Sequence, residues 1–305
     1  MTTPHHRDRI AVVGTFQVGK STLVNALLGD FVAQMGGGLS TTRLATSYHY
    51  ADLEHAILVR TDGKEDTLSI HDYLMKSYRG ELNRDKYKEA RVALYRPILQ
   101  SVVLVDTPGL DANETDEETA KKAMGDADAY LLVVSNESTL KEPQKNLLKS
   151  LDSSGKPYLI LMNCQEMSRW KVDDKQNEKI ASEIRASLTN TNRNPWRMDD
   201  KDQNSIVYPC NVAMFAEGSG LQSRMVSFLS SNGIECPGRE SFGGIIEQSF
   251  KGATPSSHDL LHKSCILNIR HRLEHWRQPI KSRLDTSLLQ INSIIKTWEK
   301  GTGNA

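Results

Sequence analysis

The octapeptide Gly14–Ser21, GTFQVGKS, decides how the rest of this sequence is interpreted. It follows the apolar run Ile10–Val13 and leads into Thr22–Gly29, so the pattern G-x-x-x-x-G-K-S stands between a predicted strand and a predicted helix. The glycines let the backbone bend until successive N–H groups point at a phosphate chain, and the positive end of the helix faces the same anion. The stretch therefore predicts a nucleotide-phosphate site rather than an ordinary glycine-rich turn.

Two side chains of this loop carry charge and metal chemistry. Lys20 puts a positive charge near the β- and γ-phosphates, and the Ser21 hydroxyl is a suitable ligand for Mg²⁺. The nucleotide contacts predicted for the loop are Gly14, Phe16, Gln17, Val18, Gly19, Lys20, Ser21 and Thr22.

A second motif, Asp106-Thr107-Pro108-Gly109, follows the apolar run Val102–Val105. A buried strand here delivers Asp106 at its carboxyl end, where an open α/β sheet binds its ligands. We expect Asp106 to hold the magnesium shell, directly or through water, and Gly109 to offer its backbone N–H to a γ-phosphate. D-T-P-G alone is a common turn, but its place after a strand and downstream of the phosphate loop makes it a strong signal.

Composition sets wide limits on function. The chain has 305 residues, 38% hydrophobic and 25% charged, and its acidic and basic residues balance at 38 each. This balance gives no reason to expect nucleic acid as a partner. The longest apolar runs have the length of strands, and the N-terminus is polar, so neither a membrane span nor a signal peptide is expected. Scattered cysteines without a C-x-x-C pair argue for reduced thiols in the cytoplasm and against zinc; they are Cys164, Cys210, Cys236 and Cys265.

Strand signals alternate with helix signals along most of the chain. This alternation predicts an α/β fold with a mostly parallel central sheet flanked by helices. Strands are predicted at 45–50, 56–60, 91–95, 101–106, 129–134, 158–162 and 205–211, with a hairpin turn at 61–64. Helices are predicted after the phosphate loop and at 69–91, 171–190 and 221–229.

The last part of the sequence carries an apolar stripe. From His258 onward, apolar residues recur every three or four positions, from Ile266 to Trp298. This spacing indicates one long helix or a helix pair, with a kink at Pro279. Such a stripe usually packs against neighbouring helices, and a partner-binding coil is the alternative.

A threonine-bearing loop at Met35–Arg43 follows the first predicted helix. The order of phosphate loop, threonine-bearing loop, DTPGL and Asn-ended strand resembles a translation-factor-class GTPase. Three stretches narrow the resemblance to bacterial dynamin-like GTPases, here in a short form. They are the run VVGTFQVGKSTLVNALLG, the segment Thr42–Thr46 that leads to Tyr50, and the passage from Arg91 through Pro97 into the DTPGL strand. The resemblance covers about residues 9–230. It implies a P-loop GTPase fold, GTP as substrate, Mg²⁺ as cofactor, and a C-terminal helical segment at the place where a dynamin stalk begins.

The resemblance also implies site residues. Thr42 matches the family's switch-I threonine, with Thr41 as the alternative, and Gln17 stands where a loop residue helps to organise hydrolysis. The implied catalytic residues are Lys20, Thr42 and Gln17, and the implied magnesium ligands are Ser21, Thr42 and Asp106. The nucleotide set further includes Thr41, Thr42, Asp106, Gly109, Asn163, Cys164, Glu166 and Asn211.

The sequence departs from the family pattern at two places, and from Ras-like enzymes at a third. Its base-reading motif is Asn163–Glu166, NCQE, where the family ends in Asp after a lysine. Glu166 can still accept from two guanine donors, and the alternative is that Asn163 caps a loop. Gln17 stands where dynamins have Ser and potassium-dependent relatives have Asn, so the sequence does not decide whether a monovalent cation binds there. Leu110 stands where Ras-like enzymes have the water-positioning Gln.

The resemblance suggests a division of the chain into four parts. They are a flexible N-terminus at 1–8, a dynamin-type GTPase domain at 9–235, a linker at 236–257, and a stalk- or bundle-like helical segment at 258–300. The expected function is Mg²⁺-dependent hydrolysis of GTP to GDP and phosphate.

The expected partner is a second copy or a related dynamin-like subunit, bound according to nucleotide state. The helical segment would relay that state to a partner or a membrane, which leaves a peripheral membrane contact open. Two alternatives remain. One is a non-hydrolysing or weakly binding regulatory subunit of a hetero-oligomer. The other is a ribosome-assembly-type GTPase, which would normally bring a basic RNA-binding module.

Overall fold

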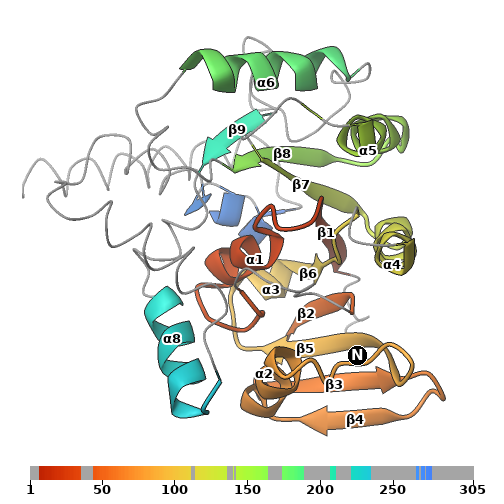
Figure 1. Ribbon diagram of the computed structural model, residues 1–305. Helices are drawn as coiled ribbons and strands as arrows, with labels where there is room; N and C mark the ends of the chain where they lie inside the picture. The colour runs from red at the N-terminus through yellow and green to blue at the C-terminus, as the bar shows by residue number, and fades with distance from the viewer. Residues whose placement is uncertain are drawn as a thin grey trace, which may run out of the picture.

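The computed structural model describes residues 7–35, 44–110, 114–135, 140, 142–163, 174–188, 207–210, 221–234 and, except for 268 and 272, residues 266–276. Within these residues the chain forms a nine-stranded sheet in the order β4-β3-β5-β2-β6-β1-β7-β8-β9. Helices cover the sheet on both faces (Figure 1). The predicted α/β fold with a flanked central sheet is therefore confirmed.

One half of the sheet is parallel throughout. Its strands are β6 (Val102–Asp106), β1 (Asp8–Gly14), β7 (Ala129–Ser135), β8 (Tyr158–Asn163) and β9 (Val207–Cys210). Each pairs in parallel with the next. The first four read as nearly continuous apolar runs because helices bury both of their faces. Parallel pairing brings their carboxyl ends to one edge of the sheet, where ligands bind in open α/β folds.

The other half is mixed. It contains β2 (Thr46–Tyr50), β5 (Tyr87–Leu94), β3 (His55–Arg60) and β4 (Glu65–Leu68). β2 runs parallel to β5 but antiparallel to β6, while β3 runs antiparallel to both β5 and β4. The predicted hairpin turn at 61–64 joins β3 to β4. Five of the eight strand pairs are parallel, so the sheet is mostly parallel as expected.

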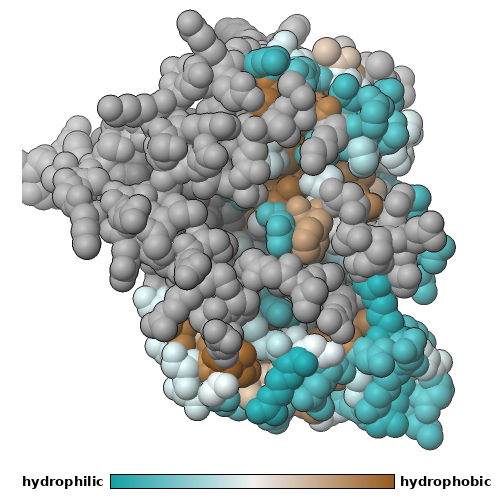
Figure 2. All heavy atoms as spheres, viewed as in Figure 1, coloured by the Kyte–Doolittle hydropathy of each residue, from teal (hydrophilic) through white to brown (hydrophobic). Residues whose placement is uncertain are grey.

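The edge of the sheet at β4 is protected by polarity. Its side chains alternate between exposed and half-buried, and Glu65 and Asp66 form ion pairs with Arg91 and Arg60. The surface over β3 and β4 is mainly hydrophilic (Figure 2). Charged side chains on an edge strand discourage pairing with another chain.

Two apolar clusters occupy the two faces of the sheet. One face is covered by α1 (Lys20–Leu28), α2 (Ile70–Tyr78), α3 (Ile98–Ser101) and α8 (Leu221–Ser231). The other face is covered by α4 (Glu114–Gly125), α5 (Glu142–Ser153) and α6 (Asp174–Ala186). Figure 1 shows α4 and α5 on one side of the sheet and α1 on the other. The sheet is thus the middle layer of three.

The helix predicted over 69–91 is wrong in its second half. α2 ends at Tyr78, Gly80 takes a positive φ of 70°, and strand β5 already begins at Tyr87. Lys88 and Glu89 favour helices in isolation, but Ala90, Val92 and Leu94 alternate inward between β2 and β3. Burial of that alternating face outweighs the local helix propensity.

The first part of the C-terminal apolar stripe packs into the domain. Ile266, Ile269 and Leu273 are buried in the same cluster as α1, and the Trp276 indole donates a hydrogen bond to the Asp8 carboxylate at the start of β1. Pro279 and the rest of the stripe lie outside the described residues, so the proposed division of the chain stays a prediction. Among the described residues, no helix is long and apolar enough to cross a bilayer.

Gly14 and Gly63 form a matched pair for testing the packing of β1. Both have positive φ, but a Cβ on Gly14 would lie 2.4 Å from the carbonyl oxygen of Val133 on β7, whereas a Cβ on Gly63 meets nothing within 4 Å. We expect Gly63→Ala to cost about 1 kcal/mol of unfolding free energy, from backbone conformation alone. Gly14→Ala adds a backbone clash and should cost about 3 kcal/mol. Urea unfolding measures both, and equal losses would contradict the tight β1–β7 contact.

Candidate functional site

The phosphate loop runs from the end of β1 to the start of α1. Positive φ angles occur at Gly14 (154°), Gln17 (59°) and Gly19 (94°). A Cβ on Gly19 would lie 2.7 Å from the amide nitrogen of Asn163, so packing as well as backbone conformation requires glycine there. Gln17 is the one non-glycine residue with positive φ in the described part of the chain. A left-handed conformation at a long side chain costs free energy and is typical of functional loops.

Lys20 and Ser21 lie where the phosphate loop meets the first turn of α1. The Lys20 ammonium donates to the carbonyl of Thr15 at 2.7 Å and is nearly buried within the loop. The Ser21 hydroxyl donates to Oδ2 of Asp106 at 2.7 Å, and both residues are buried. The structure therefore brings together two of the three magnesium ligands predicted from sequence, although they lie 85 positions apart.

The D-T-P-G loop lies directly on the phosphate loop. The Thr107 hydroxyl donates to the carbonyl of Val12 at 2.8 Å, and the Leu110 N–H donates to the carbonyl of Gly14 at 3.3 Å. A Cβ on Gly109 would lie 2.8 Å from Cα of Phe16. Close approach of two backbones thus explains this glycine. Its contact with Phe16 was not predicted from the sequence, and its predicted N–H donation to a γ-phosphate stays a prediction.

Asn163 connects the end of β8 to the same loop. Its amide group donates to the carbonyl of Val18 at 2.8 Å, and the side chain is buried. The predicted site residue therefore supports the phosphate loop. Five further predicted site residues lie outside the described residues: Thr41, Thr42, Cys164, Glu166 and Asn211. Their roles stay predictions.

A layer of hydroxyl groups beside Asp106 was not predicted from sequence. The antiparallel register of β2 and β6 sets Thr46 opposite Asp106, and the Thr46 hydroxyl lies 3.2 Å from that of Tyr73. Burial raises the pKa of Tyr73 to about 12, with a further contribution from the charge of Asp106. Burial likewise raises the pKa of Tyr48, together with Tyr73 and Asp106. These phenols stay neutral and carry no charge that would compete with the carboxylate.

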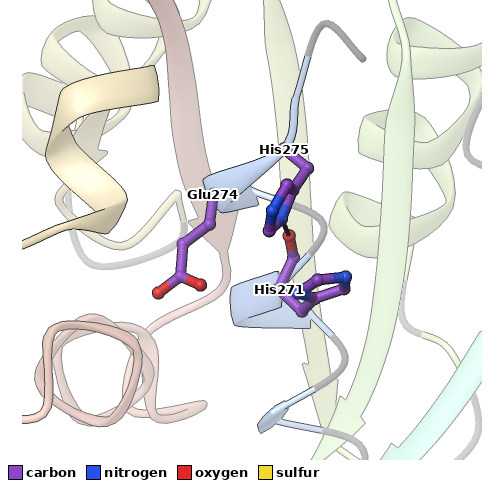
Figure 3. A group of neighbouring side chains, drawn as sticks. All are labelled: His271, Glu274 and His275. Atoms are coloured by element: carbon purple, nitrogen blue, oxygen red, sulfur yellow. Dashed lines mark hydrogen bonds between the residues drawn. The ribbon is translucent and has the colours of Figure 1, made fainter. Parts of the chain in front are cut away.

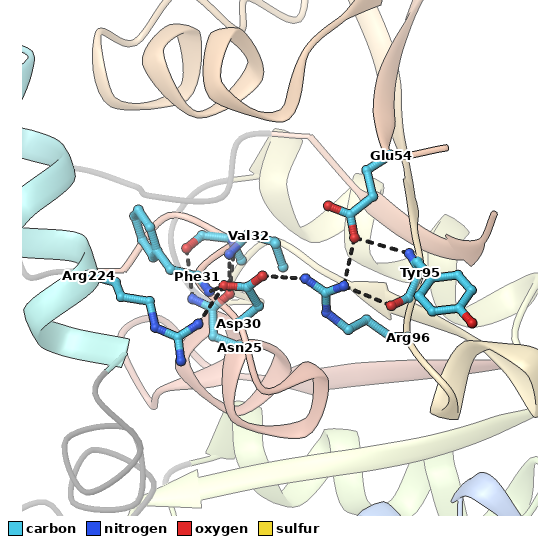
Figure 4. A network of polar contacts seen from close by, with 9 residues as sticks. Asn25, Asp30, Phe31, Val32, Glu54, Tyr95, Arg96 and Arg224 are labelled. Atoms are coloured by element: carbon cyan, nitrogen blue, oxygen red, sulfur yellow. Dashed lines mark hydrogen bonds and ion pairs between the residues drawn. The ribbon is translucent and has the colours of Figure 1, made fainter. Parts of the chain in front are cut away.

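The chain between α1 and the threonine-bearing loop is held by a polar network (Figure 4). Asn25 is fully buried, accepts the N–H groups of Val32 and Ala33 at 2.9 and 2.8 Å, and donates to the Ala33 carbonyl at 2.8 Å. This pattern holds the backbone just before residues 36–43, which carry both candidate switch threonines.

Asp30 extends this network to distant elements. Its carboxylate pairs with Arg96, which follows β5, and with Arg224 of α8 at 2.8 Å. Arg96 in turn contacts Glu54 at 2.6 Å. The segment leading to the threonine-bearing loop is thus connected to the β2–β3 loop and to α8. Nothing in the local sequence pattern pointed to these partners.

The donor set fits a magnesium ion. A serine hydroxyl and a carboxylate oxygen are hard oxygen ligands, and Mg²⁺ is usually bound by one or two such groups together with substrate phosphates. Ser21 and Asp106 supply them at the carboxyl edge of the sheet, beside the first turn of α1.

Three features define the nucleotide-binding domain of a P-loop GTPase. They are the phosphate loop between β1 and α1, the serine hydrogen-bonded to an aspartate at the end of the neighbouring strand, and the Asn-ended strand beside the loop. A family model described as the dynamin family matches residues 10–164, which is about half of the chain. The chain belongs to the dynamin family, so the resemblance inferred from the sequence is confirmed.

Individual relatives are more distant. The chain is 27% identical to mitofusin-2 of Homo sapiens over 177 residues, 56% of this chain and 23% of that protein. It is 25% identical to GTPase Der of Streptococcus pyogenes serotype M49 (strain NZ131) over 195 residues, 64% of this chain and 32% of that protein. The chain thus spans about a quarter to a third of the length of these relatives.

A comparison with solved structures finds a chain from "An oligomerised bacterial dynamin pair provides a mechanism for the long-range sensing and tethering of membranes". Its TM-score is 0.49 at 19% identity, and the match covers 87% of this chain and 37% of that chain.

Asn163→Ala tests the support that β8 gives to the phosphate loop. Removing the amide leaves a buried carbonyl at Val18 without its donor, which costs roughly 1–2 kcal/mol. We expect affinity for a non-hydrolysable GTP analogue to fall about tenfold in calorimetric titration. Asn83→Ala is the control, because that exposed side chain accepts one backbone N–H at 2.8 Å in a turn away from the loop. Unchanged affinity in Asn163→Ala would contradict this role.

Proposed function

We propose that this protein is a Mg²⁺-dependent GTPase that binds GTP on the phosphate loop and hydrolyses it to GDP and phosphate. The observation that carries this proposal is the 2.7 Å contact between Ser21 and Asp106, which joins the head of α1 to the end of β6. Membership of the dynamin family supports the choice of guanine nucleotide and of hydrolysis as the reaction.

The residues of the loop would each act on the triphosphate. Lys20 would exchange the Thr15 carbonyl for the β- and γ-phosphates, where its charge and the loop N–H groups stabilise the charge that spreads over the γ-phosphate oxygens. Ser21 and Asp106 would hold Mg²⁺, with Thr42 as a third ligand. When bound, the ion neutralises negative charge on the phosphate oxygens. Gln17 and Thr42 would position the water that attacks the γ-phosphate.

Base recognition would come from the end of β8 and the residues after it. Asn163 is already held at the phosphate loop by its contact with Val18. The carboxylate of Glu166 would accept hydrogen bonds from the guanine N–H donors, with Cys164 and Asn211 beside the base. A carboxylate that accepts two donors from one base makes charge-assisted hydrogen bonds, which are the stronger kind.

Hydrolysis would depend on association with a second copy or a related subunit. Leu110 stands at the position from which a polar side chain would orient water, and it packs against the apolar cluster of α4 and α5. A group from a partner would then complete the site. The alternative, a non-hydrolysing regulatory subunit, also fits Leu110 and is decided by the second experiment below.

Strand β1 offers a route from the nucleotide to the C-terminal segment. Gly14 at its carboxyl end begins the phosphate loop, and Asp8 at its other end accepts the hydrogen bond from Trp276. The helical segment would relay the nucleotide state to a partner or a membrane surface. The scattered cysteines favour a cytoplasmic protein, with any membrane contact peripheral.

Lys20→Ala and Ser21→Asn test the binding site. Each removes a charge-assisted or metal-binding contact, and we expect affinity for a non-hydrolysable GTP analogue with Mg²⁺ to fall on the order of 100-fold. Lys64→Ala is the control, since its ammonium is exposed in the β3–β4 turn. Isothermal titration calorimetry gives the affinities, and an undiminished affinity in either site variant would overturn the site assignment.

Dilution tests the role of association. If a partner copy completes the site, specific GTPase activity should fall on dilution, and GDP with aluminium fluoride should trap a dimer because it imitates the transition state. Light scattering measures the dimer. Constant specific activity over about a hundredfold dilution, with a monomer in every nucleotide state, would refute self-activation. No turnover at any concentration, with intact nucleotide binding, would favour the regulatory subunit.

A further inference from the structure

A second group of potential ligands lies far from the nucleotide site. His271, Glu274 and His275 form the pattern H-x-x-E-H in the C-terminal segment, and one ligand atom from each lies within 4.8 Å of the others. Figure 3 shows the three side chains along one short helical stretch. The backbone carbonyl of Glu274 accepts a hydrogen bond from Ser101, next to the start of β6, and Trp276 donates to Asp8 at the start of β1.

These contacts place the group at the amino-terminal edge of the parallel strands. The phosphate loop begins at the other end of β1, at Gly14, six residues from Asp8, which corresponds to about 20 Å. The group is therefore separate from the proposed magnesium site and uses none of its residues.

The hydrogen bonding of His275 prepares this ring as a metal ligand. Its Nδ1 lies 2.9 Å from the backbone carbonyl of His271, as the dashed line in Figure 3 shows. A carbonyl only accepts, so Nδ1 carries the proton, and in the neutral form of the ring the lone pair lies at Nε2. Histidine ligands in metal sites are held in the same way, with the other ring nitrogen donating to a carbonyl or carboxylate.

The packing of the two rings points to the same conclusion. Residues four apart on a helix share a face, and the ring centroids of His271 and His275 lie 4.2 Å apart with an interplanar angle of 49°. His271 is only 5% exposed, so its ring lies inside the protein next to that of His275. One cation could therefore reach both rings from a single side of the helix.

Glu274 supplies the negative charge of the set. Its carboxylate is half-buried and accepts from the Arg270 guanidinium through Oε1 at 3.1 Å, so Oε2 is the oxygen we assign to the ion. Two imidazoles and one carboxylate suit zinc and its neighbours, whereas Mg²⁺ and Ca²⁺ prefer oxygen ligands alone.

The spacing of the ligand atoms is compatible with this ion. Zn–N bonds of about 2.0 Å in tetrahedral geometry put ligand atoms roughly 3.3 Å apart. The separations of at most 4.8 Å between the ligand atoms are somewhat wider than this spacing, so the side chains would draw together around the ion. The scattered cysteines made a cysteine-bound zinc site improbable, but this set contains no cysteine.

We propose that His271, Glu274 and His275 bind one divalent transition-metal ion, zinc by preference, with water completing the coordination. The ion is structural: it stabilises the C-terminal segment on the amino-terminal edge of the sheet, beside the contacts of Trp276 with Asp8 and of Ser101 with Glu274.

Calorimetric titration of the full chain with ZnCl₂, without nucleotide and with Mg²⁺ in excess, tests this proposal. His5→Ala and His6→Ala are introduced throughout, so that the N-terminal histidine pair does not contribute. We expect saturable binding of one zinc ion per chain and a higher thermal midpoint with zinc. His275→Ala and Glu274→Gln should each weaken binding at least about tenfold and abolish the thermal shift.

His55→Ala is the matched control, because that ring also places Nδ1 against a nearby backbone carbonyl, that of Leu53 at 2.9 Å, and should leave zinc affinity unchanged. The two test residues are half-buried, and Glu274→Gln keeps the shape of the side chain, so metal-free urea unfolding verifies that the variants fold. Absence of saturable zinc binding, or equal affinity in the wild type and both folded variants, would overturn the proposal. Neither result depends on GTP binding or hydrolysis.

Discussion

The hydrogen bond from Ser21 to Asp106 is the interaction on which the nucleotide site depends. It joins the first turn of α1 to the carboxyl end of β6 at 2.7 Å, inside the protein. Both side chains are buried, so loss of either one would leave the other without this hydrogen bond, which is costly. The parallel pairing of β1 with β6 brings the phosphate loop beside Asp106. The contact of Asn163 with Val18 and that of Leu110 with Gly14 hold the phosphate loop from its other sides.

Strand β1 lies between the phosphate loop and the C-terminal segment. Its carboxyl end carries the phosphate loop, and its amino end lies beside the C-terminal segment through Asp8 and Trp276. This strand is paired along its length on both sides, with β6 and with β7. A metal ion at His271, Glu274 and His275 would strengthen the attachment of the segment at that end, and the nucleotide would act at the other.

The sequence predicted the parts of the site that depend on local pattern, and missed those that depend on register. The strand before Gly14–Ser21 and the strand that ends at Asp106 were predicted because the motif chemistry requires particular residues next to a strand. The strand Tyr87–Leu94 was partly read as helix because Lys88 and Glu89 favour helices in isolation. Thr46 lies opposite Asp106 only because β2 pairs antiparallel with β6, and no short-range sequence pattern encodes that pairing.

Hydrolysis of GTP measured beside ATP, in single turnover with enzyme in excess and Mg²⁺ present, tests the central claim most directly. It reports on phosphate binding, metal dependence and base preference in one experiment. We predict turnover of GTP at least about tenfold faster than of ATP, and none of either when Mg²⁺ is chelated. Equal rates for the two nucleotides would show that the end of β8 reads no base. Hydrolysis that persists without divalent ions would contradict the magnesium site at Ser21 and Asp106.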